Sequence, residues 1–280
     1  MRLTLSDLVQ KKREGRKITV LTAYDAPFAR LIDQAGIDMI VVNDGVVGAI
    51  AMGRGEGFST TIDEMVHHTR AVRTAVSNCL VVTSMTFGSY NEPRQAVVGA
   101  TKLAKEGLAD AVHLEGDRDI RDSVKAITRA GIPVVAHIGL TKQIIARTGQ
   151  TRLQARDSKG MTDVFDDAQI LVEAGACGLV LECIPEPIAK IITNSFPVVT
   201  VGIGAGRYCD GQFLVAQDIL GLFPGFDARF LKRYADLSSI ALKAFKEFKH
   251  DVESGLFPEP KHTYKMKPEE LAKALQSMKR

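Results

Sequence analysis

Short runs of wholly apolar residues alternate along the chain with longer segments whose apolar residues recur every three to four positions. The short runs are typical of strands buried on both faces in a parallel sheet, and the longer segments are typical of amphipathic helices. The predicted strands cover residues 18–21, 39–42, 79–84, 111–115, 132–137, 178–182, 196–201 and 213–220. The predicted helices between them cover residues 28–35, 61–75, 93–106, 120–130, 164–174 and 188–194.

The residues at the ends of these helices support the assignment. Asp25 stands where it can cap the first helix, and Thr61 and Glu64 have the spacing of a capping box. Four helical patterns are followed by a glycine, which suits the left-handed residue that closes a helix, at Gly36, Gly107, Gly131 and Gly175. Strands alternating with helices in this way predict a (β/α)8 barrel, and an open doubly wound sheet is the alternative.

Two segments depart from the alternation. Residues 138–161 form a long connection after the fifth strand, and residues 263–280 form a polar tail whose last part, residues 268–279, has a helical pattern. No other change in composition marks a domain boundary. We therefore expect one barrel domain over residues 1–262, with a short amphipathic helix at residues 5–12 capping its bottom, followed by the tail.

Composition excludes several classes of protein. The chain has 280 residues, 45% hydrophobic and 25% charged, and a net charge of +3, which gives no reason to expect a nucleic-acid partner. We see neither an apolar run long enough to span a membrane nor a signal peptide, so no membrane partner is expected. The four cysteines form no CxxC pair, which favours reduced thiols in a cytoplasmic protein over disulfides or a zinc site.

Chemically active residues collect where the predicted strands end. In a barrel these ends meet at one mouth, where the sequence places Asp25, Asp44, Ser84, His113, Glu115, His137 and Glu182. His113 and Glu115 are two positions apart on one strand, so both point to the same face. The carboxylates of Asp44 and Glu115 could hold a divalent cation through oxygen, as Mg²⁺ prefers.

Three of these residues also have a structural interpretation. Glu182 could be an acid favoured by the dipole of the following helix. Asp44 and Gly45 could form a tight turn, and His137 could be a core histidine bonded to the backbone. Taken together, the group favours a site.

Six segments carry a resemblance to a known family, and they extend in order over nearly the whole chain, up to about His262. They are LTAYDAPFARL, EGDRDIRDSV, PVVAHIGLTKQ, GLVLECIP, VGIGAGRYCDGQFLV and VESGLFPEPKH. With these segments the chain resembles the ketopantoate hydroxymethyltransferase family. The resemblance implies a (β/α)8 TIM barrel of the phosphoenolpyruvate/pyruvate type, a large homo-oligomer such as a decamer, and a role in pantothenate biosynthesis.

The resemblance also implies an activity. Members of the family transfer a hydroxymethyl group from 5,10-methylenetetrahydrofolate to the 2-oxo acid 3-methyl-2-oxobutanoate, giving 2-dehydropantoate, with Mg²⁺. By this likeness Glu182 is the base that removes the C3 proton, and Asp44 and Glu115 belong to the metal site. His137 corresponds to the family's histidine after the fifth strand. A metal would stabilise the enolate formed at C3.

Three positions depart from the family pattern. Gly45 replaces a serine, Ser84 replaces an aspartate that binds the metal, and His113 replaces a lysine that contacts the substrate. Asp44, Gly45, Ser84, His113 and His137 remain the predicted substrate-binding residues, with Ser84 only a weak candidate metal ligand. Each lost charge-assisted hydrogen bond costs about 1.5–3 kcal/mol. Imidazole suits Mn²⁺, Fe²⁺ or Zn²⁺ better than Mg²⁺, so His113 is either a further ligand or a neutral donor to the substrate.

These departures leave two alternatives open, a metal-dependent aldolase or lyase on another 2-oxo acid and a non-catalytic paralogue. Retention of the mouth residues Asp44, Glu115, His137 and Glu182 speaks against the second. The connection after the fifth strand is basic and is interpreted as a solvated loop, a lid or a cradle for the glutamate tail of folate. Its basic residues are Lys142, Arg147, Arg152, Arg156 and Lys159.

Overall fold

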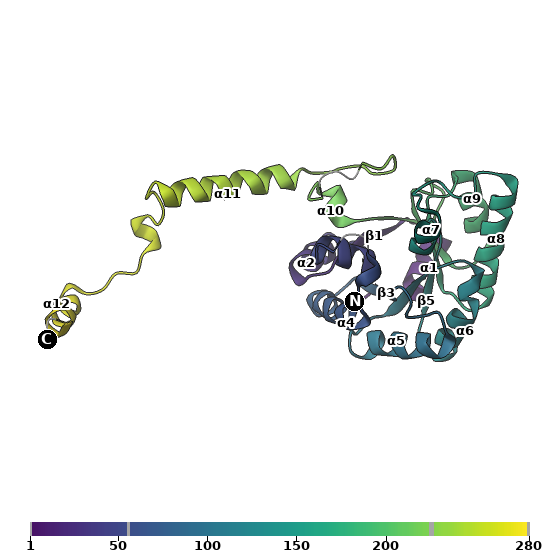
Figure 1. Cartoon of the computed structure of the whole chain (residues 1–280), viewed down its shortest axis with the longest axis horizontal. Helices are drawn as coiled ribbons and strands as arrows, with labels where there is room; N and C mark the ends of the chain where they lie inside the picture. The colour runs from purple at the N-terminus through teal and green to yellow at the C-terminus, as the bar shows by residue number, and fades with distance from the viewer. Residues whose placement is uncertain (1, 55–56, 224–226, 279–280) are drawn as a thin grey trace.

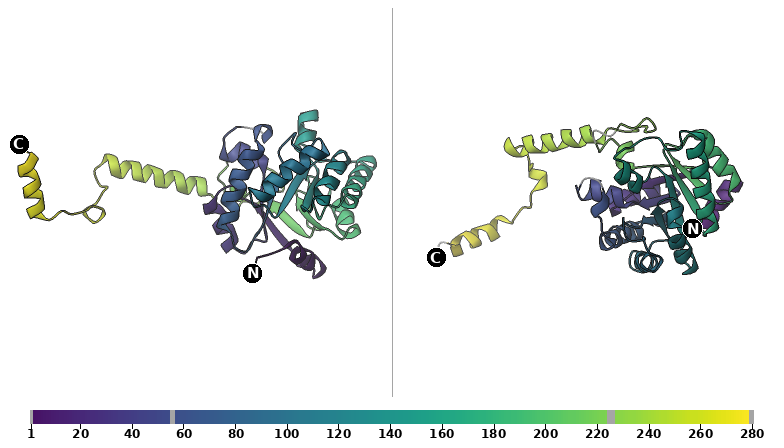
Figure 2. Two further views of the ribbon diagram at one scale, coloured as in Figure 1. Left: turned by 90° about the horizontal axis from the view of Figure 1, so that it is seen from below. Right: turned by 45° about the vertical axis from the view of Figure 1, so that its right-hand side comes forward.

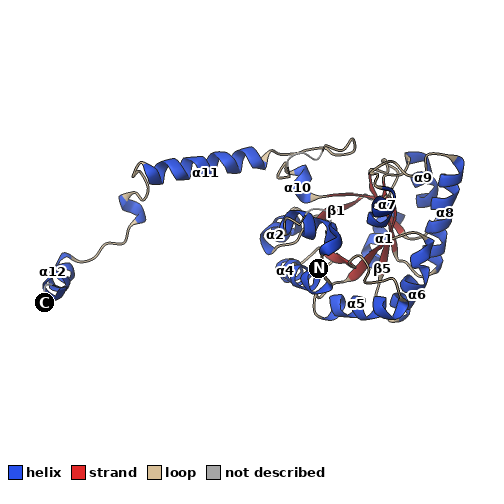
Figure 3. Ribbon diagram, viewed as in Figure 1, coloured by secondary structure: helices blue, strands red, loops and turns tan. Residues whose placement is uncertain are grey.

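The computed structural model describes residues 2–54, 57–223 and 227–278, and its centre is a closed barrel of parallel strands (Figures 1 and 3). The strands follow one another around the barrel in chain order, with β8 pairing back to β1. This confirms the barrel and excludes the open sheet. The strands are β1 (Ile18–Thr22), β2 (Met39–Val42), β3 (Leu80–Ser84), β4 (Ala111–Glu115), β5 (Val134–Gly139), β6 (Gly178–Glu182), β7 (Val199–Ile203) and β8 (Gly211–Leu214).

Helices cover the outside of the first six strands (Figure 3). The apolar faces of these helices pack against the outward side chains of the strands. The helices are α2 (Ala26–Gln34), α4 (Ile62–Ala75), α5 (Pro93–Lys105), α6 (Arg121–Arg129), α8 (Ser158–Glu173) and α9 (Glu186–Ser195). The inward side chains form a second core, which the short helix α1 (Leu5–Arg13) closes from below with Leu8, as expected. Alternation along each strand therefore separates the two cores.

The predicted helix ends are largely confirmed. Asp25 Oδ1 accepts a hydrogen bond from the Phe28 N–H at 2.9 Å, so this carboxylate caps α2. Thr61 and Glu64 form the expected capping box of α4. Gly36, Gly131 and Gly175 have positive φ, but at the end of α5 the left-handed residue is Leu108, one position after Gly107.

Several predicted boundaries are wrong, and β5 and β7 begin at Val134 and Val199, two and three residues later than predicted. Strand eight is Gly211–Leu214 and does not extend to residue 220, because the chain turns over the top of the barrel into the short helix α10 (Ala216–Ile219). The N–H of Ala216 donates to Thr22 Oγ1 at 3.1 Å and holds this turn against β1. The connection after β5 is also not a plain loop, since it contains α7 (Lys142–Thr148) and the first turn of α8.

The C-terminal part of the chain leaves the barrel. β7 is joined to β8 by residues 204–210 without a helix, and α11 (Leu237–Glu253) and α12 (Pro268–Met278) extend away as an arm (Figures 1 and 2). Large apolar side chains on α11 are exposed, Phe245 by 70% and Phe248 by 61%. The division of the chain at residue 262 remains a prediction. In the described part of the chain, each helix is too short or too polar to cross a bilayer.

Asp33 on α2 organises the turn that leads into β3, and it gives a first testable prediction. Its carboxylate accepts the backbone N–H groups of Ser77, Asn78 and Cys79 at 3.0, 2.9 and 2.7 Å. Partial burial alone would raise the pKa of Asp33, but these donors lower that pKa from 3.8 to about 2. The ionised carboxylate is therefore stabilised in the folded state.

We expect Asp33→Asn to lower the free energy of unfolding by about 1–2 kcal/mol at neutral pH. Because the folded-state pKa is lowered, the deficit should be full above pH 5 and shrink as the pH falls toward 2. Urea unfolding of both proteins at several pH values measures it. A difference that stays constant across this range would contradict the role assigned to the charge.

Candidate active site

The C-terminal ends of four neighbouring strands place their inward side chains around the mouth of the barrel. Ser84 ends β3, His113 and Glu115 lie on β4, His137 lies on β5, and Glu182 ends β6. His113 and Glu115 are both buried on the inner side, as their spacing predicted. The cavity in the mouth is lined by Glu115, His137 and Glu182, together with Asn43 and Gly45 from the segment after β2.

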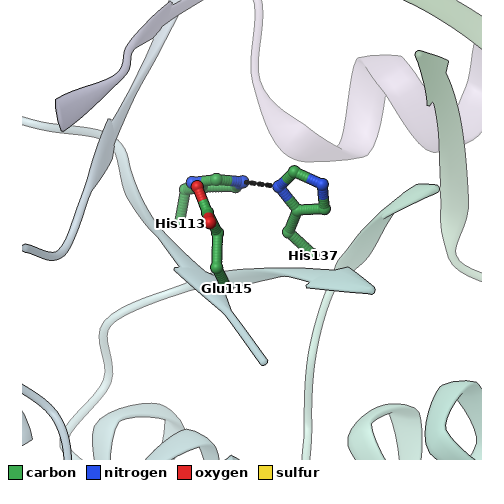
Figure 4. A group of neighbouring side chains, drawn as sticks. All are labelled: His113, Glu115 and His137. Atoms are coloured by element: carbon green, nitrogen blue, oxygen red, sulfur yellow. Dashed lines mark hydrogen bonds between the residues drawn. The ribbon is translucent and has the colours of Figure 1, made fainter. Parts of the chain in front are cut away.

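A continuous row of polar contacts joins these strand ends. Ser84 Oγ lies 2.9 Å from His113 Nδ1, and His113 Nε2 lies 3.1 Å from His137 Nδ1 (Figure 4). His137 Nε2 then lies 3.0 Å from Glu182 Oε2. We call Ser84, His113, His137 and Glu182 the polar row. It connects a buried hydroxyl to a carboxylate whose side chain is 25% exposed.

The charges along the polar row are set by burial and by Glu182. Burial, assisted by the neighbouring His137, lowers the pKa of His113 to about 3, so its ring is neutral. Burial alone would lower the pKa of His137 as well, but the contact with Glu182 raises it above its ordinary value. A protonated His137 donates through Nδ1 to His113 Nε2, which leaves His113 Nδ1 to donate to Ser84.

Asp44 lies at the start of the short helix α3 (Asp44–Val46), which follows β2. It is fully buried, and its Oδ1 accepts a hydrogen bond from the Nζ of Lys142. No described residue bonds to its Oδ2. Burial raises the pKa of Asp44. Gly45 gives this segment room, because a Cβ at that position would lie 3.1 Å from Asn43 Oδ1.

The sequence interpretation placed Lys142 in the basic connection after the fifth strand, but in the structure its side chain lies in the site. It is the first residue of α7, and its Nζ lies 3.4 Å from Glu115 Oε1 in addition to the bond to Asp44. Its backbone N–H donates to Glu115 Oε2 at 3.0 Å. These contacts outweigh burial and lower the pKa of Glu115 to about 2. The other basic residues of that connection, from Arg147 to Lys159, are exposed.

The donor atoms suit a divalent cation. The unpartnered Oδ2 of Asp44 and the ionised Glu115 offer oxygen ligands of the kind that Mg²⁺ and Mn²⁺ prefer. Among the described residues, ligand atoms of His113, Glu115 and His137 also lie within 4.8 Å of one another (Figure 4). Ser84 is less available, because its hydroxyl is engaged with His113 and with Asn43 Nδ2 at 3.3 Å.

The surroundings of Glu182 exclude its interpretation as an acid that stabilises the dipole of the following helix. The helix α9 begins at Glu186 with Pro185 as its N-cap, and Glu186 is the acid in its first turn. Glu182 therefore does not serve the helix dipole. It is held instead by its main chain, whose carbonyl accepts the N–H of Leu140 at 2.9 Å. Position 139 at the end of the neighbouring strand β5 accepts only glycine, because a Cβ on Gly139 would lie 2.1 Å from the carbonyl oxygen of Glu182.

Comparisons with known proteins agree with this geometry. A family model described as ketopantoate hydroxymethyltransferase matches residues 2–260. The chain belongs to this family. It is 46% identical to the 3-methyl-2-oxobutanoate hydroxymethyltransferase of Desulfotalea psychrophila over 94% of this chain and 95% of the relative. It is 42% identical to the enzyme of the same name from Clostridium beijerinckii, over 98% and 99%.

Solved structures support the fold alone. A phosphonopyruvate hydrolase in complex with oxalate and Mg²⁺ superposes with a TM-score of 0.61 at 15% identity, covering 98% of this chain and 99% of the other. A 2,3-dimethylmalate lyase of the PEP mutase/isocitrate lyase superfamily gives 0.60 at 17%, covering 100% and 98%. These likenesses agree with the predicted (β/α)8 barrel fold.

Within this ketopantoate hydroxymethyltransferase family member, the structure brings the predicted site residues Asp44, Ser84, Glu115, His137 and Glu182 to one mouth. The roles assigned to them remain predictions, as do those of Gly45 and His113. Asp25 is the member of the mouth group that lies apart, since it caps α2. The sequence contains one indication of the position of Lys142. Thr141, a residue that commonly caps helices, directly precedes it and marks the start of a helix at the end of β5.

Proposed function

We propose that this protein transfers a hydroxymethyl group from 5,10-methylenetetrahydrofolate to 3-methyl-2-oxobutanoate, giving 2-dehydropantoate for pantothenate biosynthesis. The names of the relatives support the substrate. The observation that carries the proposal is the pairing of Glu182 with His137 in a mouth whose wall also contains Glu115, which shares the ammonium of Lys142 with Asp44. A base therefore lies in the same mouth as a place where a cation can stabilise negative charge.

The chemistry follows from this arrangement. Glu182 removes the C3 proton of the 2-oxo acid, and the electrons of the broken C–H bond move to the keto oxygen. The contact with His137 holds the Glu182 carboxylate in position. A divalent cation, proposed to be Mg²⁺ or Mn²⁺ and held by Asp44 and Glu115, would polarise the keto oxygen when bound. The carbon C3 then forms a bond to the one-carbon unit, and both C–N bonds that hold this unit in the donor break. Water supplies the hydroxyl group, and the two folate nitrogens take up the proton removed from C3 and one proton from that water.

The folate co-substrate is assigned to the apolar side of the mouth. Phe213, Phe223 and Phe230 line the cavity there, and aromatic side chains suit a flat pterin ring. Asp218 lies on the same side, and burial raises its pKa to about 6. A carboxylate at this position can accept hydrogen bonds from the amino and ring N–H groups of the pterin.

The direct test is product formation. The full-length protein is incubated with 3-methyl-2-oxobutanoate, 5,10-methylenetetrahydrofolate and Mg²⁺ or Mn²⁺, and NMR follows 2-dehydropantoate. Folate-dependent product supports the proposal. Cleavage or exchange of 2-oxo acids without any dependence on folate would favour the aldolase or lyase alternative. Inactivity in both assays would favour the non-catalytic alternative.

The partner we propose for the arm is a second copy of this chain. The outer wall over β7 and β8 lacks a helix of its own among the described residues, while α11 exposes Phe245 and Phe248. The helices on either side of this sector also expose apolar residues, Leu31 on α2 and Ile191 on α9. Because identical chains carry both surfaces, docking the arm of one onto the wall of another covers both.

We expect the full-length protein to be a homo-oligomer, with a decamer as the size implied by the family. Replacing both Phe245 and Phe248 by glutamate should reduce its mass in light scattering. Lys246→Glu on the same helix is the matched control. An unchanged mass in the double variant would exclude the arm as the contact. The cytoplasmic location remains a prediction, which the four free thiols support.

A further inference from the structure

One cation already lies between the two carboxylates that suit a metal. The ammonium of Lys142 bonds to Asp44 Oδ1 and lies 3.4 Å from Glu115 Oε1. An ammonium and a divalent cation at this place would use the same oxygens. They would also repel each other at close range in a buried site, where charges are weakly screened.

Lys142 is anchored at this place by its surroundings. Its side chain is 16% exposed, and its backbone N–H is bonded to Glu115 Oε2. Thr141 caps the helix that Lys142 begins, so the main chain is fixed. The stem of Lys142 crosses Gly45, where an added Cβ would lie 3.9 Å from Cδ of the lysine. The ammonium can therefore move by rotation about the side-chain bonds while the backbone stays in place.

The charges that line the mouth determine where the ammonium of Lys142 would move when a substrate binds. Of the described residues that line the cavity, Lys142 alone is a lysine or arginine, whereas Glu115, Glu182 and Asp218 are acids. A 2-oxo acid brings a further negative charge. Its carboxylate therefore needs a cation, and an ammonium that turns toward it releases the oxygens of Asp44 and Glu115 at the same moment.

We propose that Lys142 is a built-in competitor for the metal, whose ammonium occupies Asp44 and Glu115 until the carboxylate of the 2-oxo acid draws it away. Metal and 2-oxo acid then bind this chain cooperatively, each favouring the other. The identity of the acid rests on the proposed function, but the competition between ammonium and metal does not. Lys142 is on this account a substrate-binding residue as well as a guard of the metal site.

The first test measures Mn²⁺ binding to the full-length protein without substrate, by the EPR signal of free Mn²⁺. We expect Lys142→Met to bind Mn²⁺ at least about tenfold more tightly than the wild type, since nothing then competes for the oxygens. Lys142→Arg keeps the charge and should bind as weakly as the wild type. Arg147→Met on the exposed side of α7 is the matched control and should change nothing.

The second test repeats the titration with saturating 3-methyl-2-oxobutanoate and without folate. In the wild type the acid should tighten Mn²⁺ binding by more than about tenfold. In Lys142→Met it should tighten binding much less, because only chelation by the acid remains. Circular dichroism and thermal melting establish that the variants are folded.

Equal Mn²⁺ affinity of the wild type and Lys142→Met without the acid would overturn the proposal. So would an equal effect of the acid on both proteins. These readouts need no turnover, so they are separate from a failure of the proposed function. If the titrations show competition between Lys142 and Mn²⁺ but no 2-dehydropantoate forms, the competition is supported and the proposed reaction is wrong.

Discussion

Replacing Glu182 by glutamine should abolish exchange of the C3 proton of 3-methyl-2-oxobutanoate with solvent, reducing its rate by a factor on the order of 10²–10⁴. Glutamine has nearly the same shape but cannot accept a proton at neutral pH. The main chain around Glu182 is fixed by Gly139 and Leu140, so the variant should fold normally. The loss would then report on chemistry and not on structure.

The measurement uses D₂O, Mg²⁺ or Mn²⁺ and no folate, with NMR following the C3 signal. Omitting folate separates formation of the enolate from transfer of the one-carbon unit. Glu186→Gln is the matched control, because Glu186 lies only four residues away and pairs with Arg207 at 3.3 Å on the surface. Exchange that survives in Glu182→Gln but requires the metal would place the base elsewhere in the mouth.

The second large effect is expected from Glu115→Gln, and it concerns stability. Glu115 is 6% exposed and receives both the ammonium and the backbone N–H of Lys142. Without its charge, the buried ammonium keeps Asp44 as its remaining anionic partner. Losing the charge-assisted hydrogen bonds that Glu115 receives costs about 1.5–3 kcal/mol, because Asp44 still compensates the charge of the ammonium. Urea unfolding should show a loss of this size.

A double-mutant cycle makes this prediction specific. In the double variant Glu115→Gln with Lys142→Met, the contact between these two residues is lost only once. The double variant should therefore be destabilised by less than the sum of the two single variants. Glu247→Gln breaks an exposed pair with Lys243 on α11 and should cost less than about 1 kcal/mol. If the two substitutions at Glu115 and Lys142 destabilise additively, the pair is not the unit that the structure indicates.

Much of the fold follows from local patterns. Apolar runs gave the positions of β1 to β7, and Asp25 and Thr61 marked helix starts that the structure confirms. The error at β8 has a physical cause. Residues 215–220 contain apolar residues on both sides of Gln217 and Asp218, but the chain turns there, where the N–H of Ala216 donates to Thr22 Oγ1. That bond joins residues far apart in the sequence, and no local pattern signals it.

The sequence by itself determined the alternation of strands and helices, the residues at the strand ends and the shared face of His113 and Glu115, because local periodicity fixes those features. Closure into a barrel was seen only in the structure. The tertiary structure alone decided which of these side chains meet. It joined Ser84, His113, His137 and Glu182 into one row across four strands. It also placed Lys142, which the sequence shows only in a basic connection, at the metal site. Of its partners, Asp44 follows β2 and Glu115 ends β4, two strands that are far apart in the sequence but both pair with β3.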